Sequence, residues 1–194
     1  MKDRKNIYLS IVALVVAVIG LSVAYAALST TLNISFGNVN QSAMTWNVGF
    51  QTGTVTGTAS GTSATGRSCG SATVTADTVT VADTTLSKPG DTCTYALTIK
   101  NTGSIAANLA TITPKAPTSV TCGTATGGKM VCGNITYKLT TDAAGNTILT
   151  TNKTLAASTG TLPVYLVVSY TGADVNATEV TQSSAAFTLI YNQA

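Results

Sequence analysis

Short segments in which every second residue is apolar recur along the chain after Leu28. The clearest is CTYALTIK, in which one phase holds Cys93, Tyr95, Leu97 and Ile99. A period of two is typical of a β-strand with one buried face, and no segment after Leu28 has the 3.6-residue period of a helix. Because turn residues separate roughly eight to ten such segments, the pattern predicts an all-β chain built as a sandwich or a small barrel.

Composition also favours strands. Charged residues make up 9% of the 194 residues, against about 25% in a typical globular protein, and Thr, Ser, Ala, Gly, Val and Asn take their place. β-Branched side chains such as Thr and Val pack well on the pleated surface of a sheet. The length suits one ordinary domain after a separate N-terminal segment.

Several segments predict particular places in such a sheet. Residues 161–170, TLPVYLVVSY, are apolar on both faces, as expected of a central strand. Residues 71–83 change phase near Asp77, so we expect two short strands or a bulge there. Residues 51–70 are rich in Gly, Thr and Ser and predict an exposed loop or a weak edge hairpin. The segment AMTWNVGF has one apolar face, made of Met44, Trp46, Val48 and Phe50.

Residues 1–26 differ in kind from the rest. Three basic residues precede an uncharged apolar run from Ile7 to Leu28, which is typical of an export signal. Ala24 and Ala26 are small residues at the two positions that a signal peptidase reads, so we predict cleavage before Ala27. A retained membrane anchor is the alternative, because the run is long enough to span a bilayer of about 30 Å. Either way, the rest of the chain is expected outside the cytoplasm.

The four cysteines are Cys69, Cys93, Cys122 and Cys132. An even number of cysteines in an exported chain predicts disulfides, and the sequence permits three pairings. We favour Cys122 with Cys132, because TCGTATGGKMVCG has two glycines near its middle and the pattern of a hairpin. This choice leaves Cys69 with Cys93. The spacings are too long and irregular for a zinc site built from close cysteine pairs.

Residues 27–194 carry seven basic and six acidic residues, dispersed along the chain, and no histidine. Such a near-neutral balance offers no basic patch for nucleic acid or for a membrane surface. Without histidine there is no His-ligated metal site and no histidine base to activate a serine or cysteine nucleophile. We therefore expect no enzyme: no catalytic residues, no metal site and no cofactor.

The stretch LSKPGDTCTYALTIKNTGSIAANL, residues 86–109, resembles a signature of the TasA and camelysin group of exported proteins. The helix ending in AYAALST and the later course STGTLPVYLVVSYTGAD also fit that group. The resemblance implies a jelly-roll or immunoglobulin-like β-sandwich at residues 27–194, following the N-terminal hydrophobic helix. It implies a secreted subunit of extracellular biofilm-matrix fibres. The camelysin members imply a metal-dependent peptidase instead, and the missing histidines depart from that chemistry.

The assembly hypothesis concerns residues 27–37. In ALSTTLNISF the apolar phase contains Leu28, Leu32, Ile34 and Phe36. After cleavage this uncharged strand would begin the mature chain, where it can pair with an open sheet edge of another subunit. Head-to-tail pairing of this kind need not close, so it can grow a filament. The alternative is that the strand folds back onto its own domain.

The expected partners are other copies of the chain, with signal peptidase acting during export. The alternative function is a secreted or membrane-tethered surface domain that binds a polysaccharide or another surface protein. Trp46 and the strand tyrosines could stack on a sugar, but their phase in apolar strands predicts core or rim positions. A pilin whose uncleaved helix builds the fibre core is a third possibility.

Overall fold

The computed structural model describes residues 14–15, 43–63, 65–173, 182 and 184–194. The chain divides into two compact units, Met1–Ser42 and Ala43–Ala194. In the first unit the described residues are Leu14 and Val15, which are helical and exposed. Within the residues that the structure describes, no helix is long and apolar enough to cross a membrane. The predicted cleavage site and donor strand lie outside the described residues: Ala24, Ala26, Ala27, Leu28, Leu32, Ile34 and Phe36.

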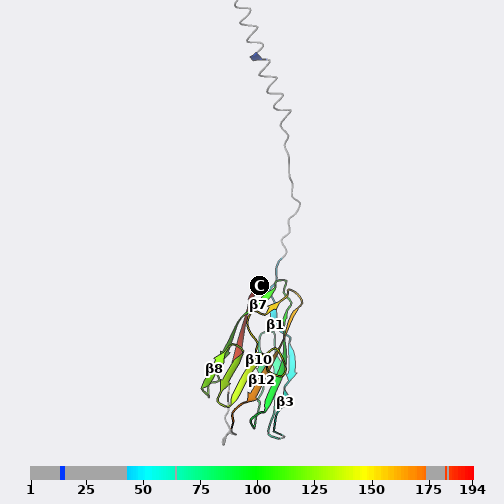
Figure 1. Ribbon diagram of the computed structural model, residues 1–194. Helices are drawn as coiled ribbons and strands as arrows, with labels where there is room; N and C mark the ends of the chain where they lie inside the picture. Colours follow the sequence, from blue (N-terminus) through cyan, green and yellow to red (C-terminus); the bar gives the residue numbers. More distant parts are fainter. Residues whose placement is uncertain (1–13, 16–42, 64, 174–181, 183) are drawn as a thin grey trace, which may run out of the picture. The chain divides into compact units, whose positions relative to one another are not determined.

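The described part of the second unit is all-β, which confirms the predicted class (Figure 1). Its strands are β1 (Val48–Phe50), β2 (Gly53–Thr56), β3 (Thr58–Ser60), β4 (Ser71–Val74), β5 (Val79–Val81), β6 (Thr92–Asn101), β7 (Ala107–Lys115), β8 (Cys122–Thr126), β9 (Lys129–Cys132), β10 (Ile135–Thr140), β11 (Thr154–Leu155), β12 (Gly160–Tyr170) and β13 (Ala186–Gln193). Turns and irregular segments form the described parts of the connections between them. The gap between β4 and β5 confirms the predicted break near Asp77.

The largest sheet is antiparallel, with the order β1-β6-β12-β10-β9-β8, and β3 pairs with β6 on the same side as β1. β12 lies between β6 and β10 and pairs with both, so the prediction of a central strand at residues 161–170 is confirmed. Its flanking strands cover both of its backbone edges. Val164 and Val167, three residues apart and therefore on opposite faces of the strand, are both buried, so the apolar run serves two covered faces.

Two three-stranded sheets, β11-β7-β13 and β2-β4-β5, pack on one face of the large sheet. Four inward residues of β6 lie on this face, and each is at most 7% exposed: Cys93, Tyr95, Leu97 and Ile99. Cys93 and Tyr95 share a core cluster with Ala72 of β4. Further along β6, Ile99 packs in a second cluster with Leu109 of β7. The predicted alternation of β6 is therefore confirmed, and it serves two separate covering sheets.

Residues 51–70 do not form the predicted exposed loop. Gly53–Thr56 is β2, which pairs with β4, and Thr58–Ser60 is β3, which pairs with β6. Threonine and valine favour strands even where no large apolar side chain marks a buried face. Ser63, a little further on, is buried. The loop prediction is thus wrong, because the criterion of apolar mass misses strands made of small β-branched residues. The alternative, a weak edge hairpin, is nearer: β2 and β3 are short, largely exposed edge strands, but they pair with β4 and β6 and not with each other.

The apolar face predicted for AMTWNVGF is correct only in its second half. Val48 and Phe50 belong to β1 and pack against the core. Met44 and Trp46 are 74% and 46% exposed, so they are not core residues. Residues 43–47 form no strand. Their backbone is instead hydrogen-bonded to the turn between β6 and β7.

Candidate assembly surface

The chain enters the described domain along the turn between β6 and β7. The Thr102 N–H donates to the Asn47 carbonyl, and the Ser104 N–H donates to the Thr45 carbonyl, both at 2.9 Å. In return, the Thr45 N–H donates to the Ser104 hydroxyl at 2.8 Å. A Cβ on Gly103 would lie 2.5 Å from the Thr45 carbonyl oxygen, so the close approach requires glycine. The start of the domain is therefore fixed to this turn.

Asn101 supports the same turn from inside. Its side chain is buried, its carbonyl oxygen accepts the Gly103 N–H at 3.0 Å, and its amide donates to the Ile105 carbonyl at 2.8 Å. The Ala194 N–H donates to the Ala106 carbonyl at 3.0 Å. The entry of the chain and its last residue thus lie at the same end of the domain, as Figure 1 shows.

Asp91, just before β6, is a fully buried carboxylate. It accepts the Ser63 N–H at 2.9 Å, the Ser63 hydroxyl at 2.6 Å, and the N–H groups of Ser87 and Lys88 at 3.0 and 2.9 Å. Arg67 Nη1 lies 3.5 Å from the same carboxylate. Burial by itself would raise the pKa of Asp91, but these hydrogen bonds outweigh it and hold the pKa well below its ordinary value. The sequence predicts only a turn at this position, because nothing near Asp91 signals its distant partner Ser63.

Two disulfides join Cys69 to Cys93 and Cys122 to Cys132, the pairing that the hairpin pattern favours. Cys93 and Cys132 are fully buried. The first disulfide ties β6 to the segment before β4, and the second ties β8 to β9. Both connect neighbouring parts of the fold, and disulfides of this kind fit an oxidising compartment.

One side of β7 lacks a strand partner along its second half. β11 pairs only with the first two residues of β7, and Leu109 adds backbone hydrogen bonds to Asn152 and Lys153. On its other side, β7 pairs with β13 along its whole length, with one bulge. Within the described ranges, no strand pairs with residues 110–115 on the β11 side. β8 lies beside β7 without pairing with it, so this stretch is an unpaired strand edge next to β8.

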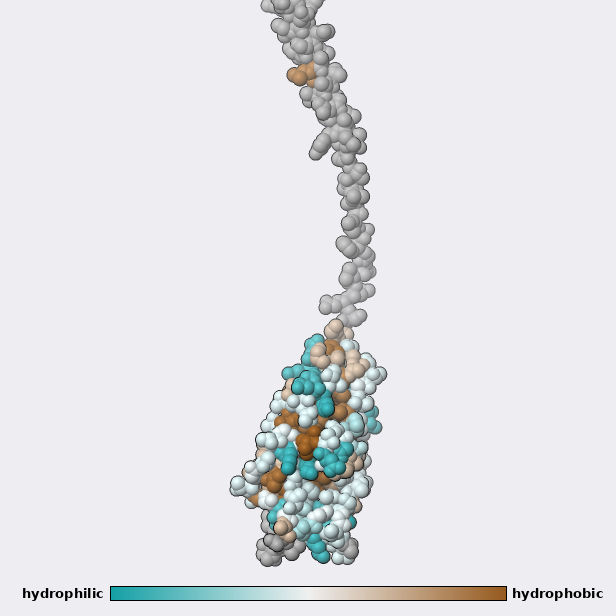
Figure 2. Space-filling model, in the orientation of Figure 1, coloured by the Kyte–Doolittle hydropathy of each residue, from teal (hydrophilic) through white to brown (hydrophobic). Residues whose placement is uncertain are grey.

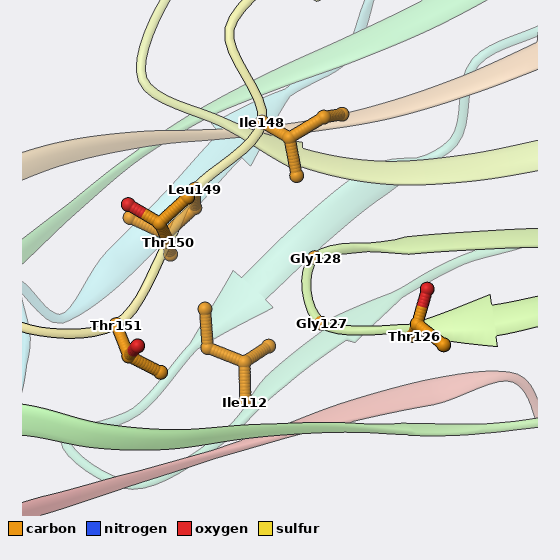
Figure 3. Close-up of a pocket in the computed structure, with 8 residues that line it drawn as sticks. All are labelled: Ile112, Thr126, Gly127, Gly128, Ile148, Leu149, Thr150 and Thr151. Atoms are coloured by element: carbon orange, nitrogen blue, oxygen red, sulfur yellow. The ribbon is translucent and has the colours of Figure 1, made fainter.

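A groove of about 340 Å³ lies beside this open edge (Figure 3). Its lining comes from β7, from the turn between β8 and β9, and from the segment before β11: Ile112, Thr126, Gly127, Gly128, Ile148, Leu149, Thr150 and Thr151. Figure 3 shows the Ile112 side chain pointing from β7 into the space between Gly127 and Thr151. No lining residue is charged. Ile112 and Leu149 belong to the core, so the floor of the groove is apolar.

A smaller hollow of about 140 Å³ lies between β1 and β13. The Tyr191 hydroxyl is buried there and has no hydrogen-bond partner among the described atoms, and burial raises its pKa to about 12. The turn between β4 and β5 covers part of this edge, because the Phe50 N–H donates to the Ala76 carbonyl at 2.7 Å. Asp77 also lines the hollow. This opening is therefore smaller and more polar than the groove beside β7.

The surface offers mostly uncharged contacts. Figure 2 shows weakly polar residues over much of the visible face of the domain, with apolar patches among a few strongly hydrophilic groups. The large hydrophobic residues that the second unit exposes within its described ranges are Met44, Trp46 and Ile190. The described residues contain no group of three or more His, Cys, Asp or Glu side chains that could hold a metal ion.

Comparison of the chain with protein-family models, with curated proteins and with solved structures finds no match. The likeness to the TasA and camelysin group thus depends on the motifs of residues 86–109 and of the two flanking regions. Because the donor strand lies outside the described residues, the open edge of β7 and its groove are the parts of the assembly hypothesis with a defined geometry.

Proposed function

We propose that the chain is a structural subunit of an extracellular fibre or biofilm matrix, and that residues 27–37 of one subunit add a strand to the next. In this proposal residues 27–194 form one β-sandwich of the jelly-roll or immunoglobulin-like type. The observation that carries the proposal is the open edge of β7, where residues 110–115 have no strand partner on one side within the described ranges. An unpaired strand edge is a template for pairing with another chain.

Residues 27–37 have the chemistry of an added strand. They carry no charge, and their apolar residues alternate with Ser, Thr and Asn. In strand addition, backbone hydrogen bonds give affinity, and pockets for alternate side chains give specificity. A donor segment at the start of one copy and an acceptor edge in the body of the next make a head-to-tail contact, which can repeat without closing.

Export to the cell surface or the matrix fits this function. Residues 1–26 have the pattern of an export signal, and cleavage before Ala27 would free the donor strand. The two disulfides fit an oxidising compartment. Other copies of the chain are the principal partner, and the proposal includes no nucleic acid.

The proposal contains no catalytic step and no cofactor. The sequence has no histidine, so a histidine-ligated peptidase centre cannot be built from it. One observation favours the alternative function of a surface-binding domain. Trp46 is 46% exposed, and exposed tryptophan is enriched at the contacts that dominate binding energy.

The test compares three mature proteins beginning at Ala27 by negative-stain electron microscopy. We expect fibres from the unmodified protein and none from Leu32→Asp/Ile34→Asp, because an unpaired charge is strongly disfavoured in an apolar groove. Thr31→Asp/Asn33→Asp adds the same charge on the polar face and should still form fibres. Monomers of the unmodified protein at every concentration and pH would contradict the proposal and favour the surface-binding domain.

A further inference from the structure

We propose that the groove beside β7 is the acceptor site, and that its occupant is residues 27–37 of a second copy of the chain, paired with β7 at residues 110–113. This inference rests on the proposed function and adds the location of the contact. It follows from three features of the described domain: a gap in a sheet, an apolar floor without charge, and the smaller opening at the competing edge, where β1 is partly covered although β13 has no strand partner on its outer side.

The gap lies where β11 stops following β7. Leu109 is hydrogen-bonded to Asn152 and Lys153. The residues that precede Asn152 follow the large sheet instead, because the Leu149 N–H donates to the Leu139 carbonyl of β10. Residues 110–113 therefore lie beyond the reach of β11. Pro114 follows them and has no N–H to donate, so it limits pairing at the far end. The space suits about four residues of an added strand, or about 13 Å.

The groove can receive an apolar side chain from such a strand. Ile112 and Leu149 form its floor, and Gly127 and Gly128 form one wall without side chains (Figure 3). Successive side chains of a strand point to opposite faces, so Leu32 and Ile34 would face the groove together while Asn33 faces solvent. The groove has no charged lining residue, and residues 27–37 have no charge. The two surfaces thus match in polarity.

The other lateral edge of the domain is a poorer acceptor. The hollow between β1 and β13 has less than half the volume, about 140 Å³ against about 340 Å³. Asp77 lines it and is exposed, and an apolar strand that covered this carboxylate would have to remove its charge from water at a cost. The hydrogen bond from Phe50 to Ala76 already uses part of the β1 edge. Natural sheets commonly cover an edge in this way to prevent pairing.

The tether to the donor strand is short. Five residues, 38–42, separate residue 37 from Ala43, where the described domain begins. Fully extended, they span at most about 18 Å. When residues 27–37 of one subunit occupy the groove of its neighbour, the turn between β6 and β7 of the first subunit, which contains Ser104, therefore lies close to that groove. The contact between subunits is predicted to be compact, without a long flexible linker.

Tryptophan substitutions at the exposed rim test the site, because a bulky side chain there would fill the groove without replacing a core residue. Thr126→Trp and Thr151→Trp are compared with Thr80→Trp, an exposed threonine on β5 that does not line the groove. We expect fibre yield to fall at least tenfold for the first two and to stay unchanged for the control. Unchanged yield for all three, with normal fibres from the unmodified protein, would overturn the acceptor site but keep the proposed function.

Hydrogen–deuterium exchange supplies a second measurement that needs no change in the groove. Fibres of the unmodified mature protein are compared with the soluble Leu32→Asp/Ile34→Asp variant. We expect new protection at residues 110–113 in the fibre. Protection confined to β13 or to β8 would place the acceptor elsewhere and overturn this inference. Failure of the unmodified protein to form fibres at all would instead overturn the proposed function, and this inference with it.

Discussion

Ser63 donates both its backbone N–H and its hydroxyl to the buried carboxylate of Asp91, at 2.9 and 2.6 Å, across 28 residues of sequence. The carboxylate also accepts the backbone N–H groups of Ser87 and Lys88. One acidic side chain thus joins the segment after β3 to the turn that starts β6. Because these four N–H or O–H donors and the Arg67 guanidinium converge on it, this site requires an acceptor that carries charge.

Replacing Asp91 by asparagine is expected to lower the free energy of unfolding by about 2–3 kcal/mol, because an amide group cannot accept all of these hydrogen bonds. Urea unfolding of the folded domain measures the loss. Asp83→Asn, at an exposed position in the same region, is the matched control and should change stability by less than about 0.5 kcal/mol. Equal stabilities for the two variants would contradict this role of Asp91.

The same carboxylate predicts a pH dependence. In the folded state the pKa of Asp91 lies below its ordinary value of 3.8, so the carboxylate stabilises the fold above that pH. As the pH falls below about 4, the unfolded chain takes up a proton before the folded one does, and this contribution is lost. The difference in unfolding free energy between the unmodified protein and Asp91→Asn should therefore shrink on acidification. A constant difference between pH 6 and pH 2 would contradict the pKa assignment.

Gly57 lies between β2 and β3 directly against the ring of Tyr95. A Cβ there would come within 2.6 Å of Tyr95 Cε1 and 2.8 Å of the Cys69 Cβ. Gly57→Ala should therefore overpack the smaller core cluster and cost about 1–3 kcal/mol of unfolding free energy. Gly123→Ala is the control, since a Cβ at Gly123 meets nothing within 4 Å. Thermal unfolding of the two variants measures the difference. Equal melting temperatures would contradict the prediction and would show that the Tyr95 ring moves aside without cost.

The two disulfides close loops of different length, with sequence separations of 24 and 10 residues. The chain-entropy model assigns them about 3.5 and about 2.8 kcal/mol of stabilisation. Cys69→Ala/Cys93→Ala should therefore lower stability more than Cys122→Ala/Cys132→Ala. Denaturant titration of both double variants measures the two losses of unfolding free energy. A larger loss on removal of the Cys122–Cys132 disulfide would contradict the prediction.

The Tyr191 hydroxyl is buried without a partner in the described part of the chain. Tyr191→Phe removes this unpaired group and is expected to raise the unfolding free energy by about 1 kcal/mol. Burial also raises the pKa of Tyr191 from 10.0 to about 12, so the folded state holds its proton more tightly than the unfolded state. Stability should consequently fall as the pH rises from about 10 towards 12, and it should fall less in Tyr191→Phe. Destabilisation by Tyr191→Phe at neutral pH would reveal an overlooked partner.

Periodicity predicts the parts of this fold in which large apolar residues mark a buried face. The inward set of β6 and the central position of β12 follow directly from the spacing of residues such as Tyr95 and Val164. The hairpin of Cys122 and Cys132 follows from its two central glycines, since they favour the turn. In each of these cases the signal is local, so a single segment of sequence contains it.

The remaining features depend on contacts between distant residues, which no local pattern contains. Met44 and Trp46 continue the apolar phase of β1, yet the hydrogen bonds of Thr45 to Ser104 hold their segment on a turn, outside any strand. The burial of Asp91 depends on Ser63 in the same way. The groove beside β7 depends on where β11 ends, and the sequence of β7 gives no sign of it.

The central claim is that residues 27–37 pass from one subunit to another. It is tested by placing the photo-crosslinker p-benzoylphenylalanine at Phe36 of the mature protein and assembling an equal mixture of isotope-labelled and unlabelled chains. Mass spectrometry then identifies the peptides joined after irradiation. We predict cross-links from residue 36 to the groove, around Ile112 and Thr151, that join labelled to unlabelled chains as often as they join like chains. Cross-links found only within one chain would show that the strand folds back onto its own domain, and would contradict the account.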